Sequence, residues 1–374
     1  MGRCGCAVGR PRHLQRAVIL ALHLDHEVTP LRLRDPFRIA RSDHGAGHVA
    51  TTLIVELRDD RFPGVVGVGV GFPDRFYGES VDTMAAVLPA LLAAIGEPAP
   101  TPDGLASAGA AMDQAIAHNG AAKCALDIAL HDLVGKVLDQ PITTLLGLTG
   151  SIPPTDFTLG LDEPAIVAER ARRAASFPAL KIKVGGPADI PTLEAVRAVY
   201  DGPIRVDANT GWQPDDAVRL LPALERLGVE LIEQPFPAHR LDQLAWLQER
   251  SSLPVVADES AVTIRDLRGL VGVVAGINVK LAKCGGIGPA RAMLEEAREL
   301  GFRTFVGCME ETSVGIAASA AVASLAEWVD LDGNLLLADD PFEGLELGRD
   351  CRWRLSDRPG LGVARRAVRS ATLV

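Results

Sequence analysis

The hydrophobic pattern of the chain changes near residue 150. Residues 16–75 contain strand-like apolar runs, whereas residues 79–148 carry apolar positions at three- and four-residue spacing, which is typical of helices. Residues 16–150 are therefore predicted to form an α+β domain. Residues 1–15 are basic and are predicted to be a disordered tail, with a secretory signal as the alternative interpretation.

From residue 151 the chain alternates short apolar runs with helical stretches. This alternation predicts a parallel β/α barrel. An open doubly wound sheet is the alternative, but no G-x-G-x-x-G follows an early strand. The eight predicted strands are TDFTLGLD, ALKIKVG, PIRVDAN, VELIEQP, PVVADES, INVKLAK, RTFVGCME and DLDGNLLL.

Polar residues gather where these apolar runs end. The carboxyl ends of barrel strands meet at one mouth, so the side chains there are expected to converge. They are Lys181, Lys183, Asp207, Asn209, Glu233, Asp258, Glu259, Lys280, Glu311, Asp330 and Asp332.

Three of these residues are carboxylates on neighbouring strands. Asp207, Glu233 and Asp258 would repel one another and take up protons unless a divalent cation joined them. All-oxygen ligands without histidine or cysteine favour Mg²⁺, with Mn²⁺ as a second possibility. The alternative is that each acid only caps the helix that follows it.

Lysine is rare in this chain and is concentrated in two predicted strands. Four of the six lysines stand in the runs KIK and NVKLAK, where burying an ammonium group is costly. Lys183 and Lys280 would face each other across the substrate, and Lys181 would disfavour the ammonium form of Lys183. Two opposed bases beside a cation predict a 1,1-proton transfer at a carbon next to a carboxylate.

Overall composition narrows the classes of partner. A net charge of −10 argues against a nucleic-acid or anionic membrane surface, and no apolar run approaches the length of a membrane span. The six cysteines lack the spacing of a disulfide framework or a zinc site, which is typical of cytoplasmic proteins. We expect a cytoplasmic homo-oligomer that acts on a small molecule.

The motifs KIKVG, VDAN, EQP, ADES and INVKLAKCGG together resemble the enolase superfamily, specifically its muconate lactonizing enzyme subgroup. The resemblance covers nearly the whole chain. It implies a modified TIM barrel, (β/α)7β, over residues 151–340, with the α+β domain 16–150 as a cap. Residues 341–374 would form a segment that returns to the cap.

The same resemblance implies roles for individual residues. Asp207, Glu233 and Asp258 become ligands of Mg²⁺, and Lys183 and Lys280 become the acid/base pair. Residues implied to support them are Lys181, which would tune Lys183, and Asn209, Glu259 and Lys283. A packing or solvated role is the alternative for the last three, and it is the favoured interpretation for Lys283.

A pair of aspartates reduces the number of reactions that the chain could catalyse. Asp330 and Asp332 stand two apart on the predicted eighth strand, so both could clamp a substrate ammonium; an exposed turn is the alternative. The pair resembles that of dipeptide epimerases of the L-Ala-D/L-Glu type. This implies epimerisation of the C-terminal residue of a dipeptide through an enediolate. The alternatives are a cycloisomerase, an o-succinylbenzoate synthase, an N-acylamino acid racemase, and a non-catalytic metal-stabilised binding protein.

The cap loops and the end of the seventh strand are expected to select the substrate side chain. Arg38 and Arg41 could meet an anionic side chain, whereas Glu310 favours a cationic or polar one. Glu310 replaces the apolar residue expected in Ala-Glu epimerases, and the arginine of those enzymes is displaced by one position toward Ser42. The preferred dipeptide stays open at this stage.

Overall fold

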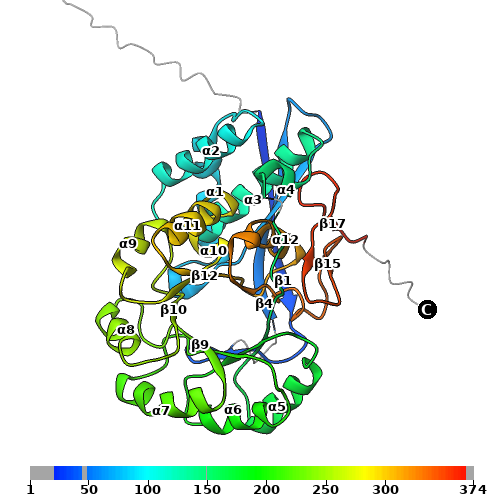
Figure 1. The fold of residues 1–374 in the computed structure, drawn as a ribbon. Helices are drawn as coiled ribbons and strands as arrows, with labels where there is room; N and C mark the ends of the chain where they lie inside the picture. The colour runs from blue at the N-terminus through cyan, green and yellow to red at the C-terminus, as the bar shows by residue number, and fades with distance from the viewer. Residues whose placement is uncertain (1–20, 44–48, 149, 368–374) are drawn as a thin grey trace, which may run out of the picture.

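The structure is a computed structural model that describes residues 21–43, 49–148 and 150–367 (Figure 1). The predicted tail, residues 1–15, and part of one cap loop, residues 44–48, lie outside the described residues. An N-terminal α+β cap and a β/α barrel make up the described part of the chain.

The cap is a three-stranded antiparallel sheet packed against helices. Its strands lie in the order β1 (Leu22–Arg32), β4 (Val49–Asp59) and β5 (Val66–Gly71). Two loops carry the short elements β2 (Arg38–Ile39), β3 (Ser42–Asp43) and η1 (Arg75–Tyr77). The helices are α1 (Val81–Ile95), α2 (Pro102–Ala115), α3 (Gly120–Val137) and α4 (Ile142–Leu146).

Strand β5 lies unusually close to α3. Its glycines, Gly67, Gly69 and Gly71, all face α3, and a Cβ atom at Gly69 would lie 1.9 Å from the carbonyl oxygen of Ala125. Helix α3 is buried along almost its whole length. The glycines of the VGVGVG run therefore let α3 approach the sheet closely. Larger residues at these positions would keep the helix farther from β5.

We expect Gly69→Ala to lower the free energy of unfolding by about 1 to 3 kcal/mol, because the added methyl group would force α3 away from β5. Gly109→Ala in α2 is the matched control. Nothing lies within 4 Å of its Cβ position, and alanine is favoured over glycine in a helix by about 1 kcal/mol. Urea unfolding of both variants measures the difference, and equal stabilities would contradict the close packing.

Eight parallel strands form the barrel in chain order, and the backbone N–H of Asp156 donates to the carbonyl of Val329, linking the first strand to the last at 3.1 Å. The strands are β6 (Phe157–Leu159), β7 (Leu180–Lys183), β8 (Ile204–Asp207), β9 (Val229–Glu233), β10 (Val255–Ala257), β11 (Gly276–Val279), β12 (Arg303–Gly307) and β13 (Trp328–Asp330).

Helical segments fill the seven connections between these strands, which confirms the (β/α)7β prediction. In Figure 1, α5 to α8 follow the lower rim, while α10 to α12 lie toward the cap. The segments are α5 (Pro164–Arg173), α6 (Asp189–Arg197), α7 (Pro214–Arg226), α8 (Leu241–Gln248), η2 (Ile264–Asp266), α9 (Leu267–Leu270), α10 (Leu281–Cys284), α11 (Ile287–Glu299), α12 (Ser313–Val322) and η3 (Ala323–Leu325).

The eighth strand begins and ends earlier than predicted. The run DLDGNLLL was expected to form it, but β13 ends at Asp330. Asp332 instead begins a turn in which its carbonyl accepts a hydrogen bond from Leu335 N at 2.8 Å. Glycine and asparagine follow Asp332, and both favour turns over strands, which explains the error.

The segment after the barrel returns to the cap. It contains β14 (Phe342–Glu343), β15 (Glu346–Leu347), β16 (Trp353–Arg354) and β17 (Ala364–Arg365). Gly360 accepts a hydrogen bond from Ile142 N of α4, and Leu361 N donates to Asp132 of α3, both at 2.8 Å. Arg365 forms an ion pair with Glu27 of β1.

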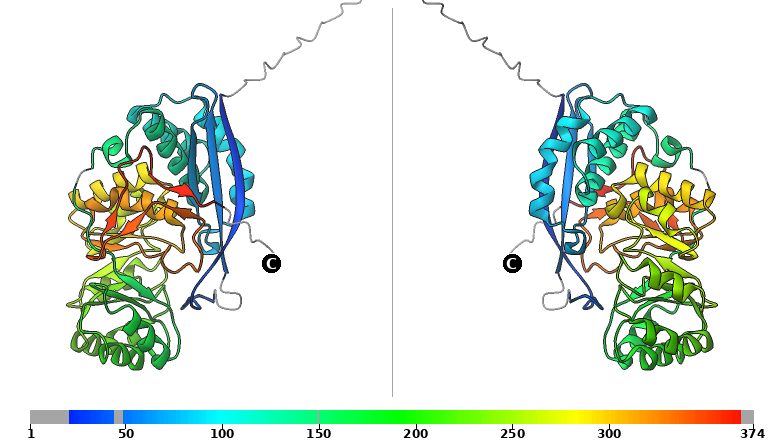
Figure 2. Two further views of the ribbon diagram at one scale, coloured as in Figure 1. Left: turned by 90° about the vertical axis from the view of Figure 1, so that its right-hand side faces the viewer. Right: turned by 90° about the vertical axis from the view of Figure 1, so that its left-hand side faces the viewer.

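The cap and the barrel share one continuous apolar core. Figure 2 shows the blue cap sheet standing along one side of the yellow and orange part of the barrel. Asp127 of α3 accepts a hydrogen bond from Ile287 N at the start of α11, at 2.6 Å, so a cap side chain caps a barrel helix. Among the described residues, no helix is both long and apolar enough to cross a membrane.

Candidate active site

Three carboxylates meet at the carboxyl ends of β8, β9 and β10. Asp207 and Glu233 are the last residues of their strands, and Asp258 directly follows β10. The three side chains are almost fully buried, and one oxygen from each lies within 4.8 Å of the others. We call these three residues the carboxylate row.

The carboxylate row has the chemistry of a hard-cation site. Burial and the charge of Asp207 raise the pKa of Glu233 to about 7. The Oε2 atom of Glu233 is buried and accepts no hydrogen bond of good geometry, although Lys181 Nζ lies 2.8 Å away. A cation bound beside Glu233 would stabilise its negative charge and would coordinate this unpaired oxygen. Asp207, Glu233 and Asp258 therefore fit Mg²⁺, which binds carboxylate oxygens.

One lysine stands at each end of the carboxylate row. Lys183, the last residue of β7, places Nζ 2.7 Å from Asp207 Oδ2. Lys280, directly after β11, places Nζ 2.9 Å from Asp258 Oδ2. The strand order β7 to β11 therefore puts the carboxylate row between the two lysines, as the proton-transfer hypothesis requires.

The two outer carboxylates respond strongly to these lysines. Burial would raise the pKa of Asp207, but Lys183 and Lys181 outweigh it and lower the value to about 2. Burial would likewise raise the pKa of Asp258, but Lys280 and Lys283 outweigh it and hold that pKa well below its usual range. Burial opposes a charge on Lys280, but Asp258 outweighs it and raises the Lys280 pKa. This ion pair favours the proton-bearing form of Lys280.

Lys181 is held as a cation inside the barrel. Its Nζ lies 2.8 Å from both Glu233 Oε2 and Asp330 Oδ2, and 3.2 Å from Asp207 Oδ2. Burial opposes the charge, but Asp330 leads the carboxylates that raise the Lys181 pKa. From the sequence, Lys181 was predicted only as a like charge beside Lys183, and these three partners were not predicted.

Asp330, the last residue of β13, and Asp332, two residues later, differ in their contacts. Asp330 accepts hydrogen bonds from Thr158 Oγ1 at 2.9 Å and from Lys181 at 2.8 Å. Asp332 accepts one from Thr158 N at 2.6 Å, and burial together with the Asp330 charge raises its pKa to about 8. Both are buried, so the exposed-turn alternative is wrong.

The predicted supporting residues lie beside the carboxylate row. Asn209 donates its backbone N–H to Asp207 Oδ1 at 2.9 Å and its side-chain amide to Glu259 Oε1 at 3.3 Å. Lys283 is more than a packing residue, because its Nζ binds Asp258 Oδ1 at 2.5 Å and three backbone carbonyls. Lys283 therefore holds Asp258, the last residue of the carboxylate row, in position.

Other supporting residues were missing from the sequence prediction. Asn278 donates to Glu233 Oε1 at 2.9 Å, Gln234 accepts from Asp258 N at 2.9 Å, and Thr158 binds both aspartates. Asn278 stands two residues before Lys280, on the same face of its strand. The two-residue period that revealed the lysines would also have found this asparagine.

Arg41 binds the protein itself. Its guanidinium pairs with Glu259 Oε1 at 2.5 Å and with Asp74 Oδ2 at 3.1 Å, and it lies over the Phe76 ring at 4.6 Å. In this structure Arg41 therefore links both cap loops to the barrel, and its contact with an anionic substrate side chain stays a prediction. The sequence alone could not predict that Arg41 would contact Asp74 and Glu259, because both are far from it along the chain.

The other specificity candidates lie where the loops surround the mouth. Arg38 is exposed on the first cap loop. Glu310 and Glu311 follow β12 and are both buried, and burial raises the pKa of Glu311 to about 7. The structure places these residues near the mouth without assigning a substrate contact to them.

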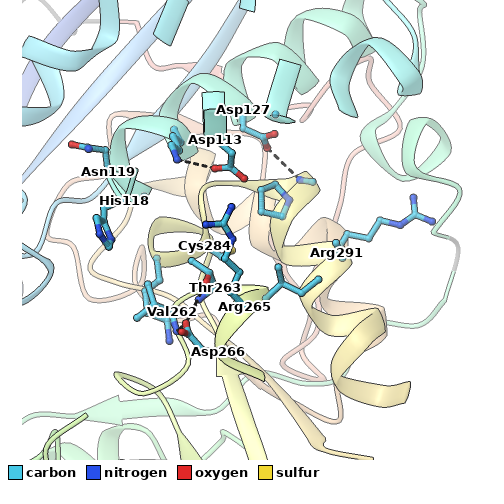
Figure 3. Close-up of a pocket in the computed structure, with 18 of the residues that line it drawn as sticks. Asp113, His118, Asn119, Asp127, Val262, Thr263, Arg265, Asp266, Cys284 and Arg291 are labelled. Atoms are coloured by element: carbon cyan, nitrogen blue, oxygen red, sulfur yellow. Dashed lines mark hydrogen bonds and ion pairs between the residues drawn. The ribbon is translucent and has the colours of Figure 1, made fainter. Parts of the chain in front are cut away.

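A separate pocket of about 1090 Å³ lies between the cap and the outer side of the barrel. Figure 3 shows His118, Asn119 and Asp127 on its cap side and Arg291 on α11. Glu259 and Lys283 border it, whereas the carboxylate row and its flanking lysines do not. The pocket therefore reaches two supporting residues of the site, but not the carboxylate row itself.

Family models match both units of the chain. Residues 24–147 match the N-terminal domain of mandelate racemase and muconate lactonizing enzyme, and residues 165–367 match the enolase C-terminal domain-like model. These matches agree with the resemblance drawn from the motifs.

Individual relatives agree with the family models. The L-Ala-D/L-Glu epimerase of Bacteroides thetaiotaomicron is 38% identical, over 89% of this chain and 85% of its own. The L-Lys-D/L-Arg epimerase of Methylococcus capsulatus is 36% identical, over 83% and 90%. A crystal structure of a dipeptide epimerase from Enterococcus faecalis, complexed with Mg and L-Leu-L-Tyr, matches at 33% identity with a TM-score of 0.84, over 91% and 99%. The chain therefore belongs to the enolase superfamily, in the family of mandelate racemase and muconate lactonizing enzyme.

Proposed function

We propose that the protein is a Mg²⁺-dependent dipeptide epimerase that inverts the α-carbon of the C-terminal residue. The observation that carries this proposal is the position of Lys183 and Lys280 at opposite ends of the carboxylate row. Epimerisation needs one group to remove a proton and another to return it on the opposite face. The names of the relatives support the same reaction.

Asp207, Glu233 and Asp258 would hold Mg²⁺, which when bound stabilises the negative charge that develops on the substrate carboxylate. Lys183 and Lys280 exchange roles with the direction of the reaction, one accepting the α-proton while the other donates. Lys181 and Lys283 keep the carboxylates in place through their ion pairs.

Asp332 is the proposed partner of the substrate's free ammonium group. Asp330 already accepts hydrogen bonds from Lys181 and Thr158, whereas Asp332 accepts one backbone N–H through Oδ2. A neighbouring cation would favour the ionised form of this buried acid. Asp330 and Asp332 were predicted to bind the ammonium group together. We now propose that Asp332 binds it, whereas Asp330 binds Lys181.

We expect Asp332→Asn to lower kcat/KM for dipeptides by roughly 10- to 150-fold, because a charge-assisted hydrogen bond to the ammonium is lost. The loss should shrink for N-acetylated dipeptides, which carry no ammonium. Asp339→Asn, at an exposed aspartate paired with Arg32, is the matched control. Initial rates on both substrate classes test the assignment.

A wild-type preference for the N-acylated compounds, with no selective loss in Asp332→Asn, would instead favour an N-acylamino acid racemase. Such an enzyme would use the same lysines and the same carboxylate row. The comparison of substrate classes therefore separates the proposed function from its nearest rival.

Several finer features are proposals drawn from the sequence. Glu310, which is buried after β12, is the proposed contact for a cationic or polar substrate side chain, and Arg38 is the proposed contact for an anionic one. A cytoplasmic location and a homo-oligomeric state are also proposed. Fractionation of the native host and light scattering of the purified protein would test them.

A further inference from the structure

A column of charged residues continues from Lys181 into the barrel, away from the carboxylate row. Lys181 binds Asp330 at 2.8 Å, and a hydrogen bond joins Asp330 to Asp156, just before β6. Asp156 accepts from Arg205 Nη1 at 2.8 Å, and Arg205 Nε donates to Glu230 at 2.8 Å. We call these five residues the charged column.

Asp156 is the unusual member of the charged column. Its side chain is fully buried, and its Oδ1 atom receives no hydrogen bond from any donor in the described protein. Yet it lies in hydrogen-bond contact with another carboxyl group, that of Asp330. Two carboxyl groups can share such a bond only if one of them carries a proton.

The surroundings indicate which carboxyl carries that proton. Asp330 receives two hydrogen bonds, from Lys181 and Thr158, which favour its ionised form. Asp156 has Arg205 alone, and Arg205 is shared with Glu230. Burial and the Asp330 charge raise the pKa of Asp156 well above its usual range, in agreement with this assignment.

We propose that Asp156 is a positioning residue that donates this proton to Asp330 and thereby fixes the Asp330 carboxylate on Lys181, an inference that rests on the proposed epimerase function. The remaining charges within the column then form two opposite pairs: Arg205 pairs with Glu230, and Lys181, which also pairs with Glu233 and Asp207 of the carboxylate row, pairs with Asp330. A neutral Asp156 separates the two pairs and keeps Arg205 from competing for Asp330.

The four members of the column other than Glu230 are buried, and apolar side chains pack beside them. Lys181 Nζ and Arg205 Cζ both lie 5.4 Å from the centre of the Phe305 ring. Phe305 belongs to a buried apolar cluster with Leu231, Val256 and Trp328. Low polarity beside the column strengthens its hydrogen bonds and makes an unpaired group costly.

Two substitutions test the proposal through their contrast. Asparagine at 156 can donate to Asp330 and accept from Arg205, as a protonated acid does, so Asp156→Asn should change kcat by less than about threefold. Asp156→Ala removes both contacts and should lower kcat by roughly 10- to 150-fold with little change in KM, because Lys181 loses its alignment. Equal losses in both variants would show that Asp156 is an ionised partner of Arg205 and would overturn the proposal.

Infrared spectroscopy tests the proton without relying on turnover or on the folding of the alanine variant. Other buried acids, such as Asp332, also contribute C=O bands of protonated carboxylic acids near neutral pH, so the test is the difference spectrum between the wild-type protein and Asp156→Asn. That difference should contain one protonated-acid C=O band that the variant has lost. Glu230→Gln, at the other partner of Arg205, should keep the band. If no band is lost in Asp156→Asn, the inference fails. If the band is lost but wild type epimerises no dipeptide, the proposed function fails while the proton assignment stands.

Discussion

Replacing either Lys183 or Lys280 by alanine will abolish epimerisation. The two ammonium groups lie at opposite ends of the carboxylate row, so each serves one face of the α-carbon. Inversion needs both faces, and general acid–base catalysis by a positioned group contributes typically about 10²- to 10⁴-fold. Each variant should lose at least that factor in kcat, as measured by polarimetry or chiral chromatography.

Exchange with solvent distinguishes opposed bases from a general loss of the site. Each lysine can still exchange the proton that it reaches, so each variant should retain exchange with one epimer only, and the two variants should retain opposite epimers. Lys136→Ala is the control, since this lysine pairs with Asp132 in the cap. Equal loss of exchange with both epimers in both variants would contradict the assignment.

Replacing Glu233 by glutamine will remove tight Mg²⁺ binding and activity together. Glu233 is the central member of the carboxylate row, and its Oε2 atom lacks a hydrogen bond in the protein alone. Even outer partners of metal ligands typically contribute about 10- to 100-fold to metal affinity, so a direct ligand should contribute at least that much. Titration calorimetry with Mg²⁺ measures the affinity.

Glu311→Gln is the matched control for this substitution. Glu311 is also buried, with burial raising its pKa to about 7, but it lies outside the carboxylate row. It should leave Mg²⁺ affinity unchanged. Wild-type affinity in Glu233→Gln, or full wild-type activity in excess chelator, would show that the carboxylate row is not the metal site.

Much of the barrel mouth could be predicted because strand geometry is local. Lys181 and Lys183 share a face of β7 for the same reason that Asp207 lies beside Glu233: side chains alternate, and neighbouring strands are in register. The eight-strand barrel followed from the repeating alternation of apolar runs and helices, and it was confirmed.

The contacts that organise these residues could not be predicted in the same way. Lys181 meets Asp330 across 149 residues, and Arg41 meets Glu259 across 218. Such pairs depend on how the barrel closes and how the cap lies on it, which no local pattern encodes. Asp156 and Thr158 were visible as polar residues in apolar runs, but only their contacts reveal their roles.

The most direct test of the proposed epimerase function measures deuterium uptake from D₂O at the α-carbon of the substrate. Wild-type protein with Mg²⁺ would be incubated in D₂O with a library of L,L-dipeptides whose C-terminal side chains are anionic, cationic or hydrophobic, and followed by NMR. We predict deuterium at the α-carbon of the C-terminal residue of at least one class, together with the appearance of the L,D epimer. Absence of exchange in every class, or exchange confined to the N-terminal residue, would contradict the assignment of a dipeptide epimerase.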